Sequence, residues 1–461
     1  MRSNISFNVG SPILIDKVDK EYNLFDCLFS QLKGKTKHLI ESVKMFINNK
    51  LDKCVSVSKI IETYPEEWFE CLSFKEAPKE RTLYRDLARI GKNYKFVVEK
   101  FQQLLKGHNL IDTVQFIDFS SAYFEGEKAE LGALGYSRDS QPGKKQLTFG
   151  IQTGMNGIPS AITIQRGNVQ DKEHMKIMLK LSEKVLDKGS LVIFDCGGNT
   201  KKTKEKILSS KLNYLTLKPR HKKTYEKYVK IYKKSEKEIF YINGIKYKCV
   251  KVKEIDVKYI FYSKNLYKKL HRNRNSKFKR ELLKGDKILA KVNKGKPVGE
   301  HISRKGNIIF KGEIQTFLSE IANPYVTGLE GFFILESSVD SEPFKMLKLY
   351  KSRDFAEKLI RNMKEGSELR PISRVEKEAI IGYMIVVFLT NCIVQLSHFL
   401  NNINIDKNLK LLKKSLNNLT LTVIYDKSLF KFSVLSNITD EIKAILGDSL
   451  KQFREKPPDF V

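Results

Sequence analysis

The sequence predicts a mixed α/β protein, and a change of residue pattern near Thr113 is the main reason. From about residue 20 to residue 108 apolar residues recur at helical spacing, as they do at Leu39, Val43 and Ile47. From Thr113 the pattern changes to short apolar runs that are typical of strands, and these alternate with helical segments. Such an order favours a sheet covered by helices over a purely helical bundle.

Residues 1–110 are expected to form a helical domain, and one of its helices has a basic face. This helix follows Pro78 and places Arg81, Arg85 and Arg89 on one side, with leucine and isoleucine side chains on another. The arrangement suits a DNA-recognition helix. It also suits an ordinary exposed amphipathic helix, because no helix-turn-helix spacing precedes it. Both interpretations stay open.

The region from 111 to 217 has the element order β-β-β-α-β-α-β, in which the first three strands predict an antiparallel meander. Asp118 ends the first strand-like run, and Asp195 follows the fourth. This order and these positions are those of a ribonuclease H-like core. We assign residues 111–217 to the first part of the core and residues 336–400 to its remainder. The expected strands are 113–118, 147–151, 158–164, 191–194 and 214–217, and the expected helices are 171–187 and 200–208.

Residues 218–335 are expected to form a β-rich insertion in this core. Asn243-Gly244 between two alternating runs is a strong signal for a β-hairpin. Residues 218–311 contain 30 lysine and arginine residues against 8 aspartate and glutamate residues. Within this stretch, residues 264–296 are expected to form an exposed basic helix and loop. Its candidate DNA-binding residues are Lys268, Lys269, Arg272 and Arg274.

Composition favours nucleic acid as the partner. The chain has 461 residues, 84 lysine and arginine residues, 53 acidic residues and a formal charge of +31, which attracts polyanions. The alternative is a merely solvated basic surface. The concentration of charge in the insertion favours a surface that faces DNA.

Other features of the sequence bear on compartment and assembly. The six cysteines have no metal-ligand or disulfide spacing, which fits a reducing cytoplasm. No signal peptide is expected. The apolar run 379–389 is too short to span a membrane, so we predict a buried core helix and no membrane partner. Residues 401–461 form a C-terminal region, expected to be helical, for which dimerisation is one candidate role.

The most specific motif is Tyr350-x2-Arg353-x3-Glu357-x6-Lys364. On one continuous helix, Tyr350, Arg353 and Lys364 would all project within roughly 40° of Glu357, opposite an apolar face. The alternative is a weak surface ion pair between Arg353 and Glu357 at i,i+4 spacing.

Asp118, Asp195 and Glu357 together would suit metal-dependent chemistry on a phosphodiester. Two Mg²⁺ ions, with Mn²⁺ as an alternative, activate the attacking oxygen and stabilise the leaving oxygen, and they prefer carboxylate and water ligands. We predict that Asp118 bridges both ions, with Asp195 on one and Glu357 on the other. The motif's tyrosine, arginine and lysine would hold DNA phosphates.

These residues resemble those of DDE transposases of bacterial and archaeal insertion sequences, in the branch marked by a Tyr-Arg-Glu-Lys motif. The resemblance covers most of residues 110–395, and it departs at Gln141-Pro142-Gly143, where Arg-Pro-Asp would be expected. Its further motifs are Gly135-Tyr136-Ser137-Arg138-Asp139, Lys145-Gln146, Gly157-x-Pro159, Gly167-Asn168-x2-Asp171, Asp195-x-Gly197 and Leu369-Arg370-Pro371.

The resemblance implies cut-and-paste movement of an insertion sequence. It implies nicking at the element's ends, hairpin formation and strand transfer, by a homodimer on paired double-stranded ends in the nucleoid-associated cytoplasm. Two alternatives remain: a non-catalytic DNA-binding protein derived from a transposase, and a nuclease or resolvase on the same core. The resemblance also implies an aromatic residue that steadies a flipped base, with Tyr247, Tyr259 and Phe261 as candidates.

Other carboxylates compete with the three that we assign. Asp139 and Asp171 lie in turn-like settings, so we expect them to serve as turn or cap residues. Asp340 and Glu342 lie in a loop before the last motif and are weaker candidates.

Overall fold

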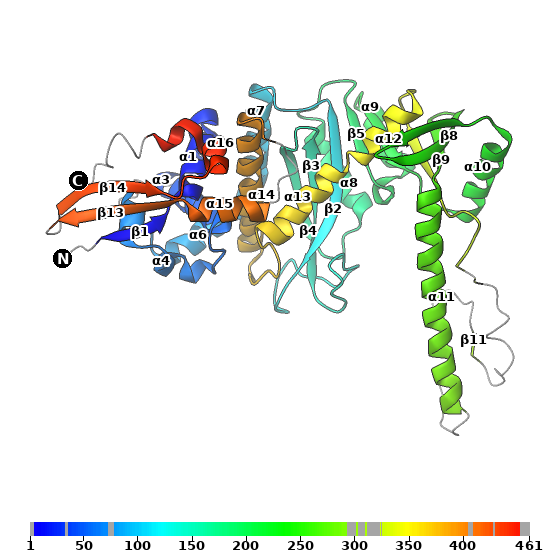
Figure 1. Ribbon diagram of the computed structural model, residues 1–461, viewed down its shortest axis with the longest axis horizontal. Helices are drawn as coiled ribbons and strands as arrows, with labels where there is room; N and C mark the ends of the chain where they lie inside the picture. Colours follow the sequence, from blue (N-terminus) through cyan, green and yellow to red (C-terminus); the bar gives the residue numbers. More distant parts are fainter. Residues whose placement is uncertain are drawn as a thin grey trace. The chain divides into compact units, whose positions relative to one another are not determined.

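A computed structural model of the chain divides into two compact units. Unit 1 comprises Met1–Asn213 and Lys351–Val461, and unit 2 comprises Tyr214–Tyr350. Each contains a β-sheet with helices packed against it (Figure 1). The structure describes residues 4–32, 36–71, 78–292, 301–302, 309–310, 323, 325–403, 409–426 and 429–451.

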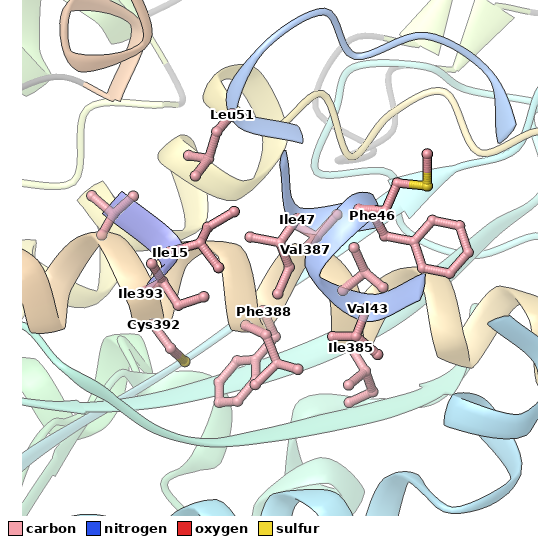
Figure 2. Packing of buried hydrophobic residues seen from close by; sticks show 14 of the residues in the cluster. Ile15, Val43, Phe46, Ile47, Leu51, Ile385, Val387, Phe388, Cys392 and Ile393 are labelled. Atoms are coloured by element: carbon pink, nitrogen blue, oxygen red, sulfur yellow. The ribbon is translucent and has the colours of Figure 1, made fainter. Parts of the chain in front are cut away.

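The N-terminal part of unit 1 is helical, as the apolar spacing predicts. Its helices share one hydrophobic core with the long helix α14 (Lys377–Leu400). Figure 2 shows Val43 and Ile47 of α3 among the apolar side chains of α14. The elements are β1 (Ile5–Asn8), α1 (Gly10–Tyr22), α2 (Leu24–Phe29), α3 (Thr36–Leu51), η1 (Val57–Lys59), α4 (Ile60–Thr63), α5 (Glu66–Cys71), α6 (Glu80–Lys92) and α7 (Tyr94–Gly107).

The catalytic-core elements predicted after residue 111 are present in the predicted order. Four strands of unit 1 form a mixed sheet in the order β4-β3-β2-β5, in which β2 runs antiparallel to β3 and parallel to β5. The elements are β2 (Val114–Tyr123), β3 (Gln146–Gly154), β4 (Pro159–Arg166), α8 (Asp171–Ser182), β5 (Leu191–Phe194), η2 (Cys196–Gly198), α9 (Lys201–Ser209) and β6 (Asn213–Leu217).

Helices from distant parts of the chain cover this sheet. Helix α8 packs on β3 and β4, α13 (Asp354–Arg361) packs on β2 and β3, and α7 and α14 pack on β4. Thus the segment after unit 2 returns to the strands that carry the predicted aspartates.

Helix α14 is the predicted core helix. It is long and apolar enough to cross a membrane, and 94% of its most apolar stretch is buried inside the protein. The prediction of a buried helix is therefore confirmed. Its contact with α6 is close at Gly91 and Gly382, where a Cβ on Gly382 would overlap the backbone oxygen of Leu87.

The two ends of the chain meet in a second sheet of unit 1. Strand β1 pairs antiparallel with β13, and β13 pairs with β14. Residues 1–110 and 401–461 therefore belong to the same compact unit as the mixed sheet, and the boundaries expected near residues 110 and 400 do not separate units. The C-terminal elements are α15 (Leu409–Asn418), β13 (Thr420–Asp426), β14 (Leu429–Ser436), α16 (Asp440–Leu446) and η4 (Gly447–Leu450).

Unit 2 contains the predicted β-rich segment together with basic helices. Five of its described strands form an antiparallel sheet in the order β6-β12-β9-β8-β7, and β10 and β11 form a separate antiparallel pair. The Asn243-Gly244 hairpin is confirmed, since both residues have positive φ and Ile242 pairs with Ile245. The elements are α10 (Lys222–Lys234), β7 (Glu238–Ile242), β8 (Ile245–Lys253), β9 (Val257–Tyr262), α11 (Lys264–Val292), β10 (His301–Ile302), β11 (Ile309–Phe310), β12 (Phe332–Ser337) and α12 (Pro343–Lys351).

Candidate active site

Two of the predicted carboxylates lie side by side on neighbouring strands. Strands β2 and β5 are parallel, and Ile117 in the middle of β2 pairs with Phe194, the last residue of β5. Asp118 follows Ile117 within β2, and Asp195 directly follows β5. Adjacent strands lie about 4.8 Å apart, and residues in register share a face, so the backbone register brings the two aspartates together.

Helix α13, which carries Glu357, packs on the strand that carries Asp118. The ring centres of Phe355 on this helix and Phe116 on β2 are 6.1 Å apart, and Phe116 shares a strand face with Asp118. The side chain of Glu357 is 44% exposed. Helix α13 therefore packs on the carboxylate-bearing face of β2 through its apolar side and leaves Glu357 open to solvent.

The Arg353 guanidinium connects two of the three carboxylates. Its Nη1 lies 3.2 Å from Asp118 Oδ1, and its Nη2 forms an ion pair with Glu357 Oε1. The Arg353 and Asp118 side chains are only 15% and 19% exposed. The simple surface pair between Arg353 and Glu357 is thus an incomplete description, because the same guanidinium also binds a half-buried carboxylate from a distant strand.

The electrostatics of Asp118 reflect this crowding. The pKa of its carboxyl is raised to about 6, chiefly by burial and also by the negative charges of Glu357 and Asp195, while Arg353 opposes the rise. A carboxyl that is costly to ionise and surrounded by other acids favours a cation in its neighbourhood.

Asp195 lies at a sharp change in the backbone. Its side chain accepts a hydrogen bond of 2.7 Å from the backbone N–H of Cys196, at the start of η2. Gly197 has no side chain where a Cβ would lie 2.5 Å from Asp171 Oδ2. The Asp195-x-Gly197 motif therefore lets η2 pass closely beside Asp171.

The prediction of one continuous helix from Tyr350 to Lys364 is wrong. Helix α12 ends at Lys351, a turn follows, α13 begins at Asp354, and the chain then forms a π-helical turn over Asn362–Gly366. A break and a π-turn both change the angle between residues. Lys364 consequently does not project with Glu357 as a regular 100° advance would require.

Lys364 instead binds Asp139. Its Nζ lies 2.6 Å from Asp139 Oδ1, and Arg370 forms an ion pair with the same oxygen. Asp139 is 1% exposed and Lys364 is 8% exposed. This buried cluster attaches the loop after β2 to the segment after α13. The described contacts of Lys364 are therefore structural ones. The prediction that Lys364 contacts phosphate has no support in this arrangement.

The competing carboxylates have cationic partners. Asp171 forms an ion pair with Arg138. In unit 2, Asp340 lies 2.9 Å from Lys251 and also pairs with Lys253, while Glu342 is exposed. The turn or cap roles expected for Asp139 and Asp171 are not what these contacts show: both side chains form ion pairs, and the N-cap of α8 is Gln170.

The three assigned carboxylates have the right donor chemistry for Mg²⁺, but in this arrangement a guanidinium stands where a metal would bind. Among the residues that the structure describes, no three His, Cys, Asp or Glu side chains form a metal-ligand cluster. The carboxylate oxygens of Asp118, Asp195 and Glu357 are hard ligands on one face of the sheet. The fit therefore requires Arg353 to move away from Asp118 and Glu357.

The predicted DNA-binding residues of α6 are unequally exposed. Arg81 and Arg85 are exposed, and Arg89 is half-buried. The apolar side of the helix, with Leu87, packs against α14. The basic side thus lies on the surface of unit 1.

Helix α11 and the motif tyrosine belong to unit 2. Lys268, Lys269 and Arg272 are exposed on α11. Arg274 differs, because it forms an ion pair with the fully buried Glu330 and donates a 3.1 Å hydrogen bond to Thr327. We correct the prediction for Arg274: its described contacts hold the helix in unit 2. Tyr350, the last residue of unit 2, is half-buried.

The aromatic candidates for steadying a flipped base are buried within unit 2. Tyr247, Tyr259 and Phe261 are 6%, 0% and 0% exposed. The Tyr259 hydroxyl donates to the backbone oxygen of Ser341. These positions give the three rings packing roles in the sheet of unit 2.

Sequence reasoning missed the long-range ion pairs of the site. The contacts Arg353–Asp118 and Lys364–Asp139 each join a residue that precedes unit 2 in the sequence to one that follows it. The acidic residue in Ser137-Arg138-Asp139 and the later lysine were both visible, but a single sequence carries no signal that pairs them.

Comparisons with known proteins show a distant structural likeness. No protein-family model matches the chain, and no curated protein matches it. Among solved structures, the chain is similar to piggyBac transposase in a cryo-EM structure of its synaptic complex with hairpin DNA. The similarity covers 91% of this chain and 83% of that chain, with a TM-score of 0.43 and 11% sequence identity.

Proposed function

We propose that the protein is a metal-dependent DNA transposase that nicks DNA at the ends of an insertion sequence and transfers the freed strand. The observation that carries the proposal is the register of Asp118 and Asp195 on parallel strands, together with the Arg353 guanidinium that joins Asp118 to Glu357. Three carboxylates from separate elements meet there on one face of what we propose is a ribonuclease H-like core.

In this proposal Asp118, Asp195 and Glu357 hold Mg²⁺ or Mn²⁺. When bound, two such ions supply Lewis-acid activation of an attacking oxygen and stabilisation of a leaving oxygen. Asp118 follows the last residue of β2 that pairs with β5, Asp195 follows β5, and Asp118 contacts Arg353, the partner of Glu357, so Asp118 would share in holding either ion.

Arg353 has two successive roles in the proposal. In the structure it neutralises Asp118 and Glu357. If these carboxylates held a metal instead, the Arg353 guanidinium would be available to bind a DNA phosphate through its bidentate fork. The Tyr-Arg-Glu-Lys branch remains part of this proposal, with Tyr350 as a second phosphate contact and with Lys364 in a structural role.

DNA binding is proposed for the exposed basic helices. Arg81 and Arg85 on α6, and Lys268, Lys269 and Arg272 on α11, are exposed cations suited to backbone phosphates. Paired double-stranded element ends would require a homodimer, and the site of action would be the nucleoid-associated cytoplasm.

The experiment is incubation of the purified protein with Mg²⁺ and DNA that carries the short inverted repeats flanking its gene. A transposase yields nicked or hairpinned ends and products joined to a target. Cutting without joining would favour the nuclease alternative, and binding without cutting would favour a non-catalytic DNA-binding protein.

A further inference from the structure

A cavity of about 210 Å³ lies within unit 1, apart from the three carboxylates. It is formed where α3, the segment after α3, α6 and the start of α14 approach the chain around the Leu369-Arg370-Pro371 motif. The described lining residues that matter here are Lys50, Arg370, Arg374, Glu368 and Tyr383. The lining thus contains three basic residues and the acidic Glu368, from segments far apart in the sequence.

Lys50 is a buried cation without a described carboxylate partner. The residue is 6% exposed, and its Nζ donates a 2.8 Å hydrogen bond to the Tyr383 hydroxyl. That hydroxyl in turn donates to the backbone oxygen of Glu368. An ammonium group has three N–H donors, so this contact leaves capacity for an acceptor inside the cavity.

Arg374 supplies a second cation at the rim. Its guanidinium carbon lies 5.2 Å from the centre of the Tyr84 ring on α6, and the residue is half-buried. Stacking on a ring leaves the in-plane N–H groups of a guanidinium available to an anion. Arg370, by contrast, already pairs with Asp139.

We propose that this cavity binds a phosphate group, with Lys50 and Arg374 as its charged contacts. A buried cation without an anion beside it is unfavourable because it has lost its hydration, and a bound anion offsets that loss. Phosphate accepts several charge-assisted hydrogen bonds at once, which matches an ammonium and a guanidinium on one cavity.

The surroundings connect the site to a surface for nucleic acid. The exposed Arg81 and Arg85 lie on α6, the helix whose Tyr84 stacks with Arg374. Arg370, which lines the cavity, forms an ion pair with Asp139, which also binds Lys364. The phosphate could therefore belong to a DNA backbone or be free inorganic phosphate. This proposal does not depend on the catalytic one.

Two measurements on the full-length protein test the site and distinguish these sources. The first is the melting temperature in inorganic phosphate and in chloride at equal ionic strength, because a ligand of the folded state raises it. The second is the affinity for duplex DNA at several salt concentrations. Both compare the wild type with Lys50→Gln and Arg374→Gln, and with Lys180→Gln on α8 as a control of equal charge change.

A free-phosphate site predicts that phosphate raises the melting temperature of the wild type and the control, and that both cavity variants lose part of the rise. A backbone-phosphate site predicts that the cavity variants reduce the salt slope of DNA binding by about 0.9 for the lost contact. Either result supports the proposal.

The proposal is overturned if Arg374→Gln matches the wild type and the control in both measurements. Arg374 lies at the rim, so this variant decides the outcome even where loss of the buried Lys50 impairs folding.

Discussion

Asp118 is the residue on which the account of the site depends. Its place on the strand that follows Thr113 was predictable from the apolar run before it, although β2 continues to Tyr123 and does not end at Asp118. The position of Asp195 directly after its strand was predicted correctly. Its contact with Arg353 was not predictable, because the two residues are joined only by folding of the segments on either side of unit 2. The local pattern therefore identified the carboxylates, and only the structure identified the cation among them.

The raised pKa of Asp118 predicts a pH-dependent stability difference between the wild type and Asp118→Asn in metal-free buffer. Its ordinary value is 3.8 and its folded value is about 6, so rising pH ionises the unfolded chain first and destabilises the folded protein. The asparagine variant lacks this loss, so its advantage in unfolding free energy should grow by about 2–3 kcal/mol between pH 4 and pH 7. Denaturant melts at both pH values measure it; a constant difference would refute the cause given.

Arg353 predicts a competition between the guanidinium and metal ions. Arg353→Gln removes the cation from Asp118 and Glu357, so Mn²⁺ should bind about tenfold more tightly, which corresponds to one charge-assisted contact. Titration followed by electron paramagnetic resonance of free Mn²⁺ provides the affinity. The matched control is Arg361→Gln, which changes the same charge on α13 and is exposed. Equal or weaker binding by Arg353→Gln would mean that Arg353 orders the carboxylates for the metal.

Among the elements, short regular patterns were predicted well and irregular ones were not. The apolar strand 191–194, the hairpin at Asn243-Gly244 and the core helix α14 all follow from local spacing and turn chemistry. The break before Asp354 and the π-turn that contains Lys364 do not follow from local spacing. Long-range ion pairs accompany them: Arg353 pairs with Asp118 on β2, and Lys364 pairs with Asp139 in the loop after β2. A regular helical projection therefore placed Arg353 with Glu357 correctly and placed Lys364 wrongly.

The contact between α6 and α14 predicts a severe effect of a single methyl group. In Gly382→Ala the new Cβ would overlap the backbone oxygen of Leu87, which no side-chain rearrangement can relieve. The expected loss of unfolding free energy is about 3 kcal/mol or more. Gly107→Ala is the control, because nothing lies near its Cβ position at the end of α7, and it should gain up to about 1 kcal/mol. Thermal melts of the two variants compare them; similar melting temperatures would contradict the close packing.

For the whole molecule, the sequence suggested more segments than the structure has units. The helical character of the N-terminal part was predicted, but the sharing of one core with α14 was not. The pairing of β1 with β13 joins the two ends of the chain, and strand pairing at that separation has no local signature. The basic insertion was recognised because its charge and its hairpin are both local features.

The shared core predicts that the N-terminal part cannot be removed as a domain. A fragment from residue 109 to 461 would expose the side chains of α14 that α3, α6 and α7 cover. We expect it to aggregate or to lack a cooperative melting transition, as differential scanning calorimetry would show. A monomeric fragment with a sharp transition would instead establish an independent N-terminal domain.

The central claim is that Asp118, Asp195 and Glu357 act as one metal centre for phosphodiester cleavage. The most direct measurement is the Mg²⁺-dependent cleavage rate on end DNA for Asp118→Asn, Asp195→Asn and Glu357→Gln, beside Asp187→Asn as a matched control with an exposed side chain. Our account predicts that each of the three variants loses cleavage while DNA affinity stays within a few-fold of the wild type, and that the control cleaves normally. Normal cleavage by any one of the three variants would contradict it.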